Sequence, residues 1–237
     1  MDEKRSMTRQ APLRISVVMP VWQEQAFLPL ALEALHKLEQ GLEILVVDGD
    51  PTGSSLQVIH DPSVVQLIAP KGRASQMNAG ARQATGDVLL FLHADTTLPS
   101  GALDAIRAAL AEPKTVGGAF SPIFDSRKAF FRLLAWCHGW RARITRIPYG
   151  DQAIFIRCEL FFLLGGYPAE PWLEDILLMR QVRRAGKVVI LPDRVITSAR
   201  RFQSEGILRT GWRYAASMTL SLFGVQPKTL RRLFPDA

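Results

Sequence analysis

The first half of the chain alternates short apolar runs with longer helical patterns. Four runs are apolar nearly throughout and are predicted as strands: ISVVM (15–19), EILVV (43–47), VVQLI (64–68) and DVLLFL (87–92). Between them, 25–38 carries apolar residues at helical spacing, and 74–84 is rich in small, helix-compatible residues. Continuous apolar strands separated by helices indicate a parallel sheet covered on both faces. The predicted fold class is therefore α/β, with a doubly wound, mostly parallel sheet whose ligands lie beyond the carboxyl ends of the strands.

The order of elements changes in the second half. Helical patterns occupy 101–111, 129–146 and 174–185, and two short runs, AIFIR (153–157) and VVILP (188–192), are predicted as strands. This part indicates a smaller mixed α and β region. Because no repeat, low-complexity segment or linker separates the halves, we predict one domain over 13–202. A disordered lead-in (1–12) precedes it, and a basic, amphipathic helical extension (203–237) follows it.

The charge is distributed unevenly along the chain. Residues 1–175 hold 17 basic and 19 acidic side chains, whereas 176–237 hold 12 and 3, so the two parts carry −2 and +9. Such an asymmetry favours an anionic partner for the C-terminal part: lipid headgroups, nucleic acid or a diphosphate leaving group. Charge alone does not choose among these three.

The cysteines and the hydropathy bear on the compartment. Cys137 and Cys158 are the only cysteines, and neither has metal-ligand spacing, so we expect two small buried side chains in a reducing cytoplasm. The longest apolar candidate in the C-terminal part, AASMTLSLFGV (215–225), is too short to span a bilayer. It is interpreted as a buried helix or as a segment lying on the cytoplasmic face of a membrane.

Polar residues follow three of the predicted strands. PVWQE (20–24) comes after the first strand and DGDPTG (48–53) after the second, where a carboxylate can accept from a nucleotide's base or ribose. Lys71-Gly72-Arg73 precedes the next helix, whose free N–H groups and positive end attract anions. Taken singly, these are ordinary turns with solvated charges.

The fourth strand leads directly into His93-Ala94-Asp95. A carboxylate emerging there suits Mg²⁺ or Mn²⁺, which takes one or two carboxylates and completes its shell with diphosphate oxygens and water. The competing interpretation is a helix N-cap, because Thr96, Thr97 and Pro99 precede the helical pattern at 101–111.

Together these motifs resemble the family-two glycosyltransferases of the GT-A fold, and the resemblance covers about 14–192. The matching segments are PVWQE, ILVVDGD (44–50), KGRASQMNAGARQATGD (71–87) and HAD (93–95). It implies that Pro20, Val21, Glu24 and Asp48 line the base and ribose, and that Lys71 and Arg73 lie near the nucleotide or its phosphates. Asp95 is then the metal carboxylate. The chain departs from the family at His93, where Asp is usual, so His93 is a metal ligand, a substrate contact or a packed side chain.

The second half resembles the acceptor side of that family. Tyr149-Gly150-Asp151-Gln152 precedes a strand, and Gly165-Gly166-Tyr167 is followed by Leu173-Glu174-Asp175. The resemblance implies that Asp175 is the catalytic base of an inverting transfer and that Glu174 orients it or the acceptor. Asp151, Gln152 and Arg201 are expected near the acceptor or the diphosphate. A Glu-Asp pair at a helix start is also what the helix dipole favours by itself.

The resulting hypothesis is a hexosyltransferase-like enzyme that uses Mn²⁺ or Mg²⁺ and a nucleotide-sugar donor, UDP-linked by resemblance, with GDP as the other candidate. The family's processive Gln-x-x-Arg-Trp signature is missing, since only QVRR (181–184) and ARRF (199–202) occur, so transfer of one sugar is expected. The acceptor is a hydroxyl, with a lipid-linked one suggested by the aromatic residues between Phe130 and Trp140. The main alternative is a degenerate nucleotide-sugar-binding protein; a nucleic-acid-binding module leaves the strand-end acids unexplained.

Overall fold

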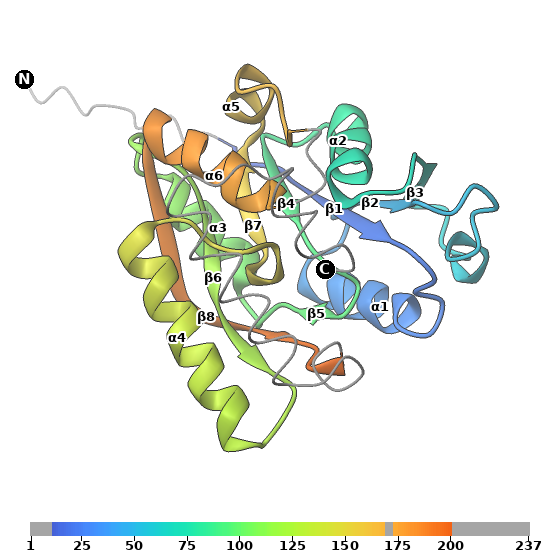
Figure 1. Cartoon of the computed structure of the whole chain (residues 1–237). Coiled ribbons are helices and arrows are strands. Elements are labelled where there is room, and N and C mark those ends of the chain that lie inside the picture. The colour runs from blue at the N-terminus through green and yellow to red at the C-terminus, as the bar shows by residue number, and fades with distance from the viewer. Residues whose placement is uncertain (1–10, 169–172, 201–237) are drawn as a thin grey trace, which may run out of the picture.

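The apolar runs of the first half form the parallel part of one sheet. A computed structural model describes residues 11–168 and 173–200, and its eight strands follow the order β3-β2-β1-β4-β7-β6-β8-β5 (Figure 1). The parallel strands are β1 (Ile15–Val21), β2 (Glu43–Asp48), β3 (Val64–Ile68) and β4 (Val88–Phe91). All four predicted strands are confirmed. Only β3, at the sheet edge, departs from the expected burial, because Val65 and Ile68 are exposed.

The remaining strands make the sheet mixed. They are β5 (Thr96–Thr97), β6 (Thr115–Phe124), β7 (Ile154–Arg157) and β8 (Lys187–Thr197). β7 runs antiparallel to both β4 and β6, whereas β6 and β8 run parallel to each other. The predicted α/β class, with a mostly parallel half and a smaller mixed region, is confirmed.

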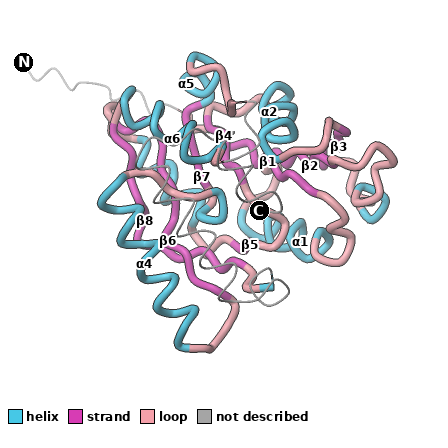
Figure 2. Tube along the Cα trace, viewed as in Figure 1, coloured by secondary structure: helices cyan, strands magenta, loops and turns pink. Residues whose placement is uncertain are grey.

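Helices cover both faces of the sheet (Figure 2). On one face, α1 (Leu28–Leu38) and α3 (Ala102–Leu110) pack against a buried cluster that includes Val17 and Met19. On the other, α2 (Arg73–Gln83) and α6 (Glu174–Ala185) pack against Val18. Successive residues of a strand point to opposite faces, so a continuous apolar run supplies both cores. The remaining helices are α4 (Ala129–Thr145) and α5 (Cys158–Leu163), with short 3₁₀ turns at Leu56–Val58 and Gly150–Gln152.

Strand β6 is the largest element that the sequence did not predict. Its sequence, TVGGAFSPIF, contains two glycines and a proline, which are depleted in strands. The glycines are needed for close packing: a Cβ on Gly117 would lie 2.7 Å from the Phe155 carbonyl oxygen, and one on Gly118 would collide with the Val189 carbonyl. The two glycines therefore lower the strand propensity of this segment and also allow the neighbouring strands to pack closely against it.

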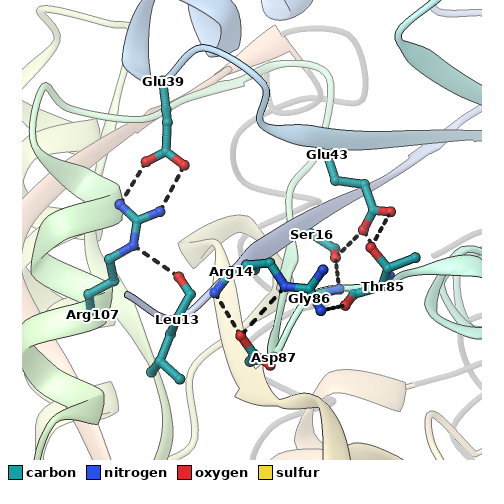
Figure 3. A network of polar contacts seen from close by, with 9 residues as sticks. All are labelled: Leu13, Arg14, Ser16, Glu39, Glu43, Thr85, Gly86, Asp87 and Arg107. Carbon is teal, nitrogen blue, oxygen red and sulfur yellow. Dashed lines mark hydrogen bonds and ion pairs between the residues drawn. The ribbon is translucent and has the colours of Figure 1, made fainter. Parts of the chain in front are cut away.

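A polar network joins the opposite ends of the strands, away from the carboxyl edge (Figure 3). Glu43 accepts a hydrogen bond from the Ser16 hydroxyl. It also accepts from the backbone N–H and from the hydroxyl of Thr85, both at 2.9 Å. Burial alone would raise the pKa of Glu43, but these hydrogen bonds outweigh it and hold that pKa below its usual range. Nearby, Arg107 forms a two-pronged pair with Glu39 and donates to the Leu13 carbonyl oxygen at 3.0 Å.

We expect Glu43→Ala to lower the free energy of unfolding by about 1–3 kcal/mol, because it leaves Ser16 and Thr85 without their shared acceptor. Urea denaturation followed by circular dichroism measures this change. Glu33→Ala, which removes an exposed carboxylate paired with Lys37, is the control and should leave the midpoint nearly unchanged. Equal midpoints for the two variants would contradict a stabilising role for the network.

Several sequence-based expectations concern regions at or beyond the described residues. The lead-in (1–12) lies almost wholly outside them, as do the extension (203–237) and Arg201, and the domain limits stay predictions. The expectation that both cysteines are buried is wrong: Cys137 is exposed on the outer side of α4, and Cys158 is only partly covered. No helix among residues 11–168 and 173–200 is long and apolar enough to cross a bilayer.

Candidate functional site

The carboxyl ends of the central parallel strands are closed by two buried polar side chains. The Asp48 carboxylate, fully buried, accepts from the backbone N–H of Asp50 at 2.9 Å and of Ser55 at 2.8 Å, which fixes the loop after β2. From α2, the Gln76 amide donates to the carbonyl oxygens of Val21 at 2.7 Å and Val47 at 2.8 Å. These hydrogen bonds hold the ends of β1 and β2 together and fix the loop that follows β2.

The predicted nucleotide residues divide into two groups. Pro20 and Val21 are buried within β1, and the observed bonds of Asp48 are those of its own loop, so their visible contribution is to shape this edge. Lys71 is exposed, and its ammonium group lies 3.6 Å from the centre of the Trp22 ring, a cation–π contact. That contact brings the loop before α2 to the loop after β1.

Arg200, just after β8, joins two of the predicted carboxylates. Its guanidinium donates to Glu24 and lies 3.4 Å from the Asp95 carboxylate, and it also stacks at 4.3 Å on the Phe27 ring. Burial raises the pKa of Asp95, and the charge of Arg200 opposes that rise. One guanidinium therefore contacts both Glu24, predicted to bind the nucleotide, and Asp95, predicted to bind the metal ion.

A second ion pair crosses from α2 to α6. The Arg73 guanidinium lies 2.7 Å from the Glu174 carboxylate, which is nearly fully buried. Glu174 and Asp175 begin α6, as predicted, and the residue before them, Leu173, adopts φ 60°. A left-handed backbone is rare for leucine and costs about 1 kcal/mol or more, a strain that occurs often at functional sites. Gln23 and Ala153 share this feature, each beside another predicted site residue.

Asp175 is held against the turn that contains Asp151. One oxygen of Asp175 accepts from the Gly150 N–H at 3.0 Å. A Cβ on Gly150 would lie 2.6 Å from that oxygen and 3.1 Å from His93 Nε2, so only glycine fits between the carboxylate and the imidazole. His93, from the first half of the chain, and Asp175, from the second half, therefore lie on either side of Gly150.

Burial shifts the proton affinities of both acceptor-side aspartates upward. It raises the pKa of Asp175 to about 7, the negative charge of Glu174 adds to the rise, and Arg73 opposes it. It raises the pKa of Asp151 to about 6, against the charges of Arg141 and Arg73. A carboxyl group whose pKa lies near 7 can both take up and release a proton at physiological pH.

His93 is shifted in the other direction. Burial and the charge of Arg73 lower its pKa to about 4, with Glu174 opposing them, so the imidazole is neutral at physiological pH. A neutral imidazole does not repel a metal ion, so all three roles expected for His93 stay open. A neutral His93 can act as a ligand, as a substrate contact or as packing beside Gly150.

Buried carboxylate oxygens without a hydrogen-bond partner collect in this region. Among the described residues, Glu24, Asp151, Glu174 and Asp175 each have one such oxygen. Asp175 feels the charges of Glu174 and Asp151, whereas Glu24 lies against Arg200. Buried polar atoms are nearly always paired in folded proteins, so these unpaired oxygens indicate groups left for a ligand.

The carboxylates at this edge suit a divalent cation only if the ion takes most of its ligands from elsewhere. Within 11–168 and 173–200, no three or more His, Cys, Asp or Glu side chains are grouped to hold a metal ion. Mg²⁺ and Mn²⁺ at phosphate-transfer sites need only one or two protein carboxylates, with diphosphate oxygens completing the shell. Asp95 is partly exposed at the carboxyl edge and fits that requirement. The described residues do not offer a set of ligands that would enclose the ion by themselves.

Gln152 lies in the turn that precedes β7. Its amide oxygen accepts from the Tyr149 N–H and its amide nitrogen donates to the Phe120 carbonyl oxygen, both at 3.0 Å. The side chain is fully buried, and its observed contacts fix the turn that carries Asp151. A direct contact of Gln152 with an acceptor or diphosphate remains a prediction.

Sequence reasoning assigned no role in the site to Asn78, Arg141 or His138. Asn78 donates to the Tyr167 carbonyl oxygen at 2.8 Å and accepts from the Tyr167 N–H at 2.9 Å. Arg141 of α4 stacks on the Tyr149 ring at 3.6 Å, and His138 packs edge-on against the same ring. The Asn within the helix could be found as a motif, but its partner, 89 residues away, could not.

Curated relatives match parts of the chain. An undecaprenyl-phosphate 4-deoxy-4-formamido-L-arabinose transferase of Proteus mirabilis is 32% identical over 44% of this chain and 36% of its own length. A PGL/p-HBAD biosynthesis glycosyltransferase of Mycobacterium bovis is 29% identical over 66% of this chain and 64% of its own length. A probable glycosyltransferase of Bacillus subtilis, YdaM, is 24% identical over 73% and 47%. This chain thus spans about a third to two thirds of the length of these relatives.

Solved structures share the fold at lower identity. A mannosyltransferase of Pyrobaculum calidifontis, determined with GDP-Man and Mn²⁺, has a TM-score of 0.60 and 20% identity over 79% of this chain and 57% of its own. TarS of S. aureus in complex with UDP-GlcNAc has a TM-score of 0.61 and 16% identity over 78% and 58%. At these identities the likeness establishes the GT-A fold. The model of the family described as glycosyl transferase family 2 matches residues 16–166, more than half of the chain, and the protein therefore belongs to that family.

Proposed function

We propose that the protein transfers one sugar, with inversion, from a nucleoside diphosphate sugar to a hydroxyl acceptor. The single observation that carries this proposal is the position of Asp175: a buried carboxylate beside the Tyr167 side chain, with a pKa of about 7, one oxygen bound to the Gly150 N–H and the other outside hydrogen-bonding geometry with any described residue. That arrangement suits a general base, because the free oxygen can accept a proton while the other keeps the group oriented.

The chemistry divides among residues of the two halves. The acceptor oxygen attacks the anomeric carbon as its proton passes to the free oxygen of Asp175, while the bond from that carbon to the diphosphate oxygen breaks. The Arg73 and Glu174 pair holds α6 against α2, so Asp175 stays aligned with the donor side. Asp95, with His93 as a candidate second ligand, would hold Mn²⁺ or Mg²⁺. When bound, that ion neutralises charge on the departing nucleoside diphosphate.

The acceptor is proposed to be a hydroxyl group. A phosphate acceptor is already ionised near neutral pH, so it needs no base. It would also enter a region that holds Asp151, Glu174 and Asp175. Some relatives carry undecaprenyl phosphate, a lipid phosphate, in their names. Such a name supports the lipid part alone, so the finer part of the proposal is a lipid-linked acceptor that attacks through a hydroxyl. We place the reaction in the cytoplasm or at the cytoplasmic face of a membrane.

A donor screen tests the proposal. UDP-, GDP- and dTDP-sugars are measured by calorimetry with and without Mn²⁺, and release of the nucleoside diphosphate is followed in parallel. We expect one donor to bind only with metal and to be turned over slowly by water or a simple alcohol. Metal-dependent binding without turnover by any acceptor would favour the alternative, a degenerate nucleotide-sugar-binding protein of the same fold.

A further inference from the structure

Helix α4 exposes an apolar face that packs against nothing in the described structure. At 100° per residue, its outward apolar side chains occupy an arc of about 120°. They are Phe130, Leu133, Trp136, Cys137, Trp140 and Ile144, which we call the aromatic face. The two tryptophans are 61% and 48% exposed, and Ile144 is 73% exposed. Five of the twelve exposed large apolar side chains of the described residues lie on this one helix.

The charges around the aromatic face have one sign. Between Asp125 and Asp151 the chain contains six Lys or Arg residues and no acidic residue. Lys128, Arg132 and Arg143 are exposed, and the last two border the aromatic face along one side of the helix. A partner for this surface must therefore offer apolar area together with negative charge.

This combination argues against a second copy of the chain as the partner. In a symmetric dimer each face meets itself, so the cations of one aromatic face would lie against those of the other without a carboxylate between them. An anionic bilayer meets both requirements, because tryptophan rings settle at the headgroup level while arginine and lysine reach the lipid phosphates.

The inner side of the same helix reaches the acceptor half of the site. Arg141 stacks on Tyr149 at 3.6 Å, and His138 packs on that ring at 5.4 Å between ring centres. Tyr149 begins the turn that carries Gly150 and Asp151, and Gly150 binds Asp175. One helix thus has an aromatic, basic outer face and an inner face against the predicted acceptor site.

We propose that the aromatic face of α4 docks on an anionic membrane surface and thereby holds the acceptor side of the site near membrane-bound substrate. The docking itself rests on the described surface of α4. Its link to a lipid-linked acceptor rests on the proposed function.

Vesicle flotation of the full chain tests the docking. Vesicles of phosphatidylcholine with about 30 mol% phosphatidylglycerol are compared with phosphatidylcholine alone. We expect binding to the anionic vesicles and a loss of about tenfold or more in partition coefficient for Trp136→Ser/Trp140→Ser. The matched control, Leu30→Ser/Leu163→Ser, removes two apolar side chains that are even more exposed, 68% and 82%, from other helices and should bind like the wild type. Equal binding by both double variants would overturn the proposal.

A charge pair of variants tests the electrostatic part. Lys128→Gln/Arg132→Gln should weaken binding severalfold, and about 0.5 M salt should do the same to the wild type. Arg82→Gln/Arg184→Gln removes the same charge elsewhere and serves as the control. If the control weakens binding as strongly, the attraction is unspecific and α4 is not the docking face.

Cys137, on the aromatic face, reports whether that face is free. We expect a water-soluble maleimide to modify Cys137 rapidly in the free protein and slowly with anionic vesicles, read by mass spectrometry against Cys158. Slow modification without vesicles would show that the face is covered by a second copy or by residues 201–237, and would overturn the proposal. Flotation without donor binding would instead refute the proposed function alone, because the docking readouts need no donor.

Discussion

Asp175→Asn should lower kcat by about 10³-fold while leaving the affinity for the donor within a few-fold of wild type. The amide oxygen can still accept from the Gly150 N–H, so the local fold persists, but the group can no longer take a proton at physiological pH. Nucleoside diphosphate release in the presence of acceptor measures kcat, and calorimetry measures donor binding.

The pH profile gives the same prediction an independent test. Because burial raises the pKa of Asp175 to about 7, the proposed base is mostly protonated below that pH and cannot accept a proton. The wild-type kcat/KM should therefore rise with pH up to about 7 and then level off, and Asp175→Asn should lack this limb. Asp193→Asn, an exposed aspartate on β8, is the matched control. Near-wild-type turnover by Asp175→Asn would exclude it as the base.

Asp95→Asn should weaken metal-dependent donor binding by about 100-fold or more, because Asp95 supplies the carboxylate that would hold the proposed metal ion. Binding measured without metal should change little. Calorimetry with a Mn²⁺ titration at fixed donor concentration separates the two effects. Asp104→Asn, on α3 with a largely exposed side chain, is the control.

The outcome also separates two explanations for the position of Asp95. If the carboxylate served only to anchor Arg200, Asp95→Asn would lower thermal stability and leave the metal dependence intact. Under the metal hypothesis the metal dependence itself is lost. Unchanged Mn²⁺ dependence in a folded variant would contradict the assignment.

The fold was predictable where one physical signal dominated. Strands buried on both faces must be apolar throughout, so β1, β2 and β4 were visible as runs, and the amphipathic α1 was visible by its period. β6 was not, because its close contacts require Gly117 and Gly118, whose propensity opposes a strand. Tertiary packing there outweighs local preference, and one sequence does not reveal the neighbour that demands a glycine.

The site was predictable in its residue types and less so in its connections. Carboxylates after strands and at the start of a helix pointed to Asp95 and Asp175, since parallel strands bring their carboxyl ends to one edge. The role of Arg200 as the cation between Glu24 and Asp95 was not predictable, because 176 residues separate it from Glu24. At His93 the chain departs from the family pattern. The structure shows that this side chain is neutral and lies beside Gly150, which binds Asp175.

Helix α2 holds both halves of the site at once. Gln76 ties it to the ends of β1 and β2, Arg73 to Glu174, and Asn78 to the turn at Tyr167. Hybrid enzymes built from related transferases would have to preserve these three contacts. A crossover between the two halves of the chain would combine α2 from one parent with Tyr167 and Glu174 from another, and these contacts would no longer match. A hybrid should therefore exchange the Gly166–Asp175 region together with positions 73 and 78, so that a new acceptor specificity arrives with its own support.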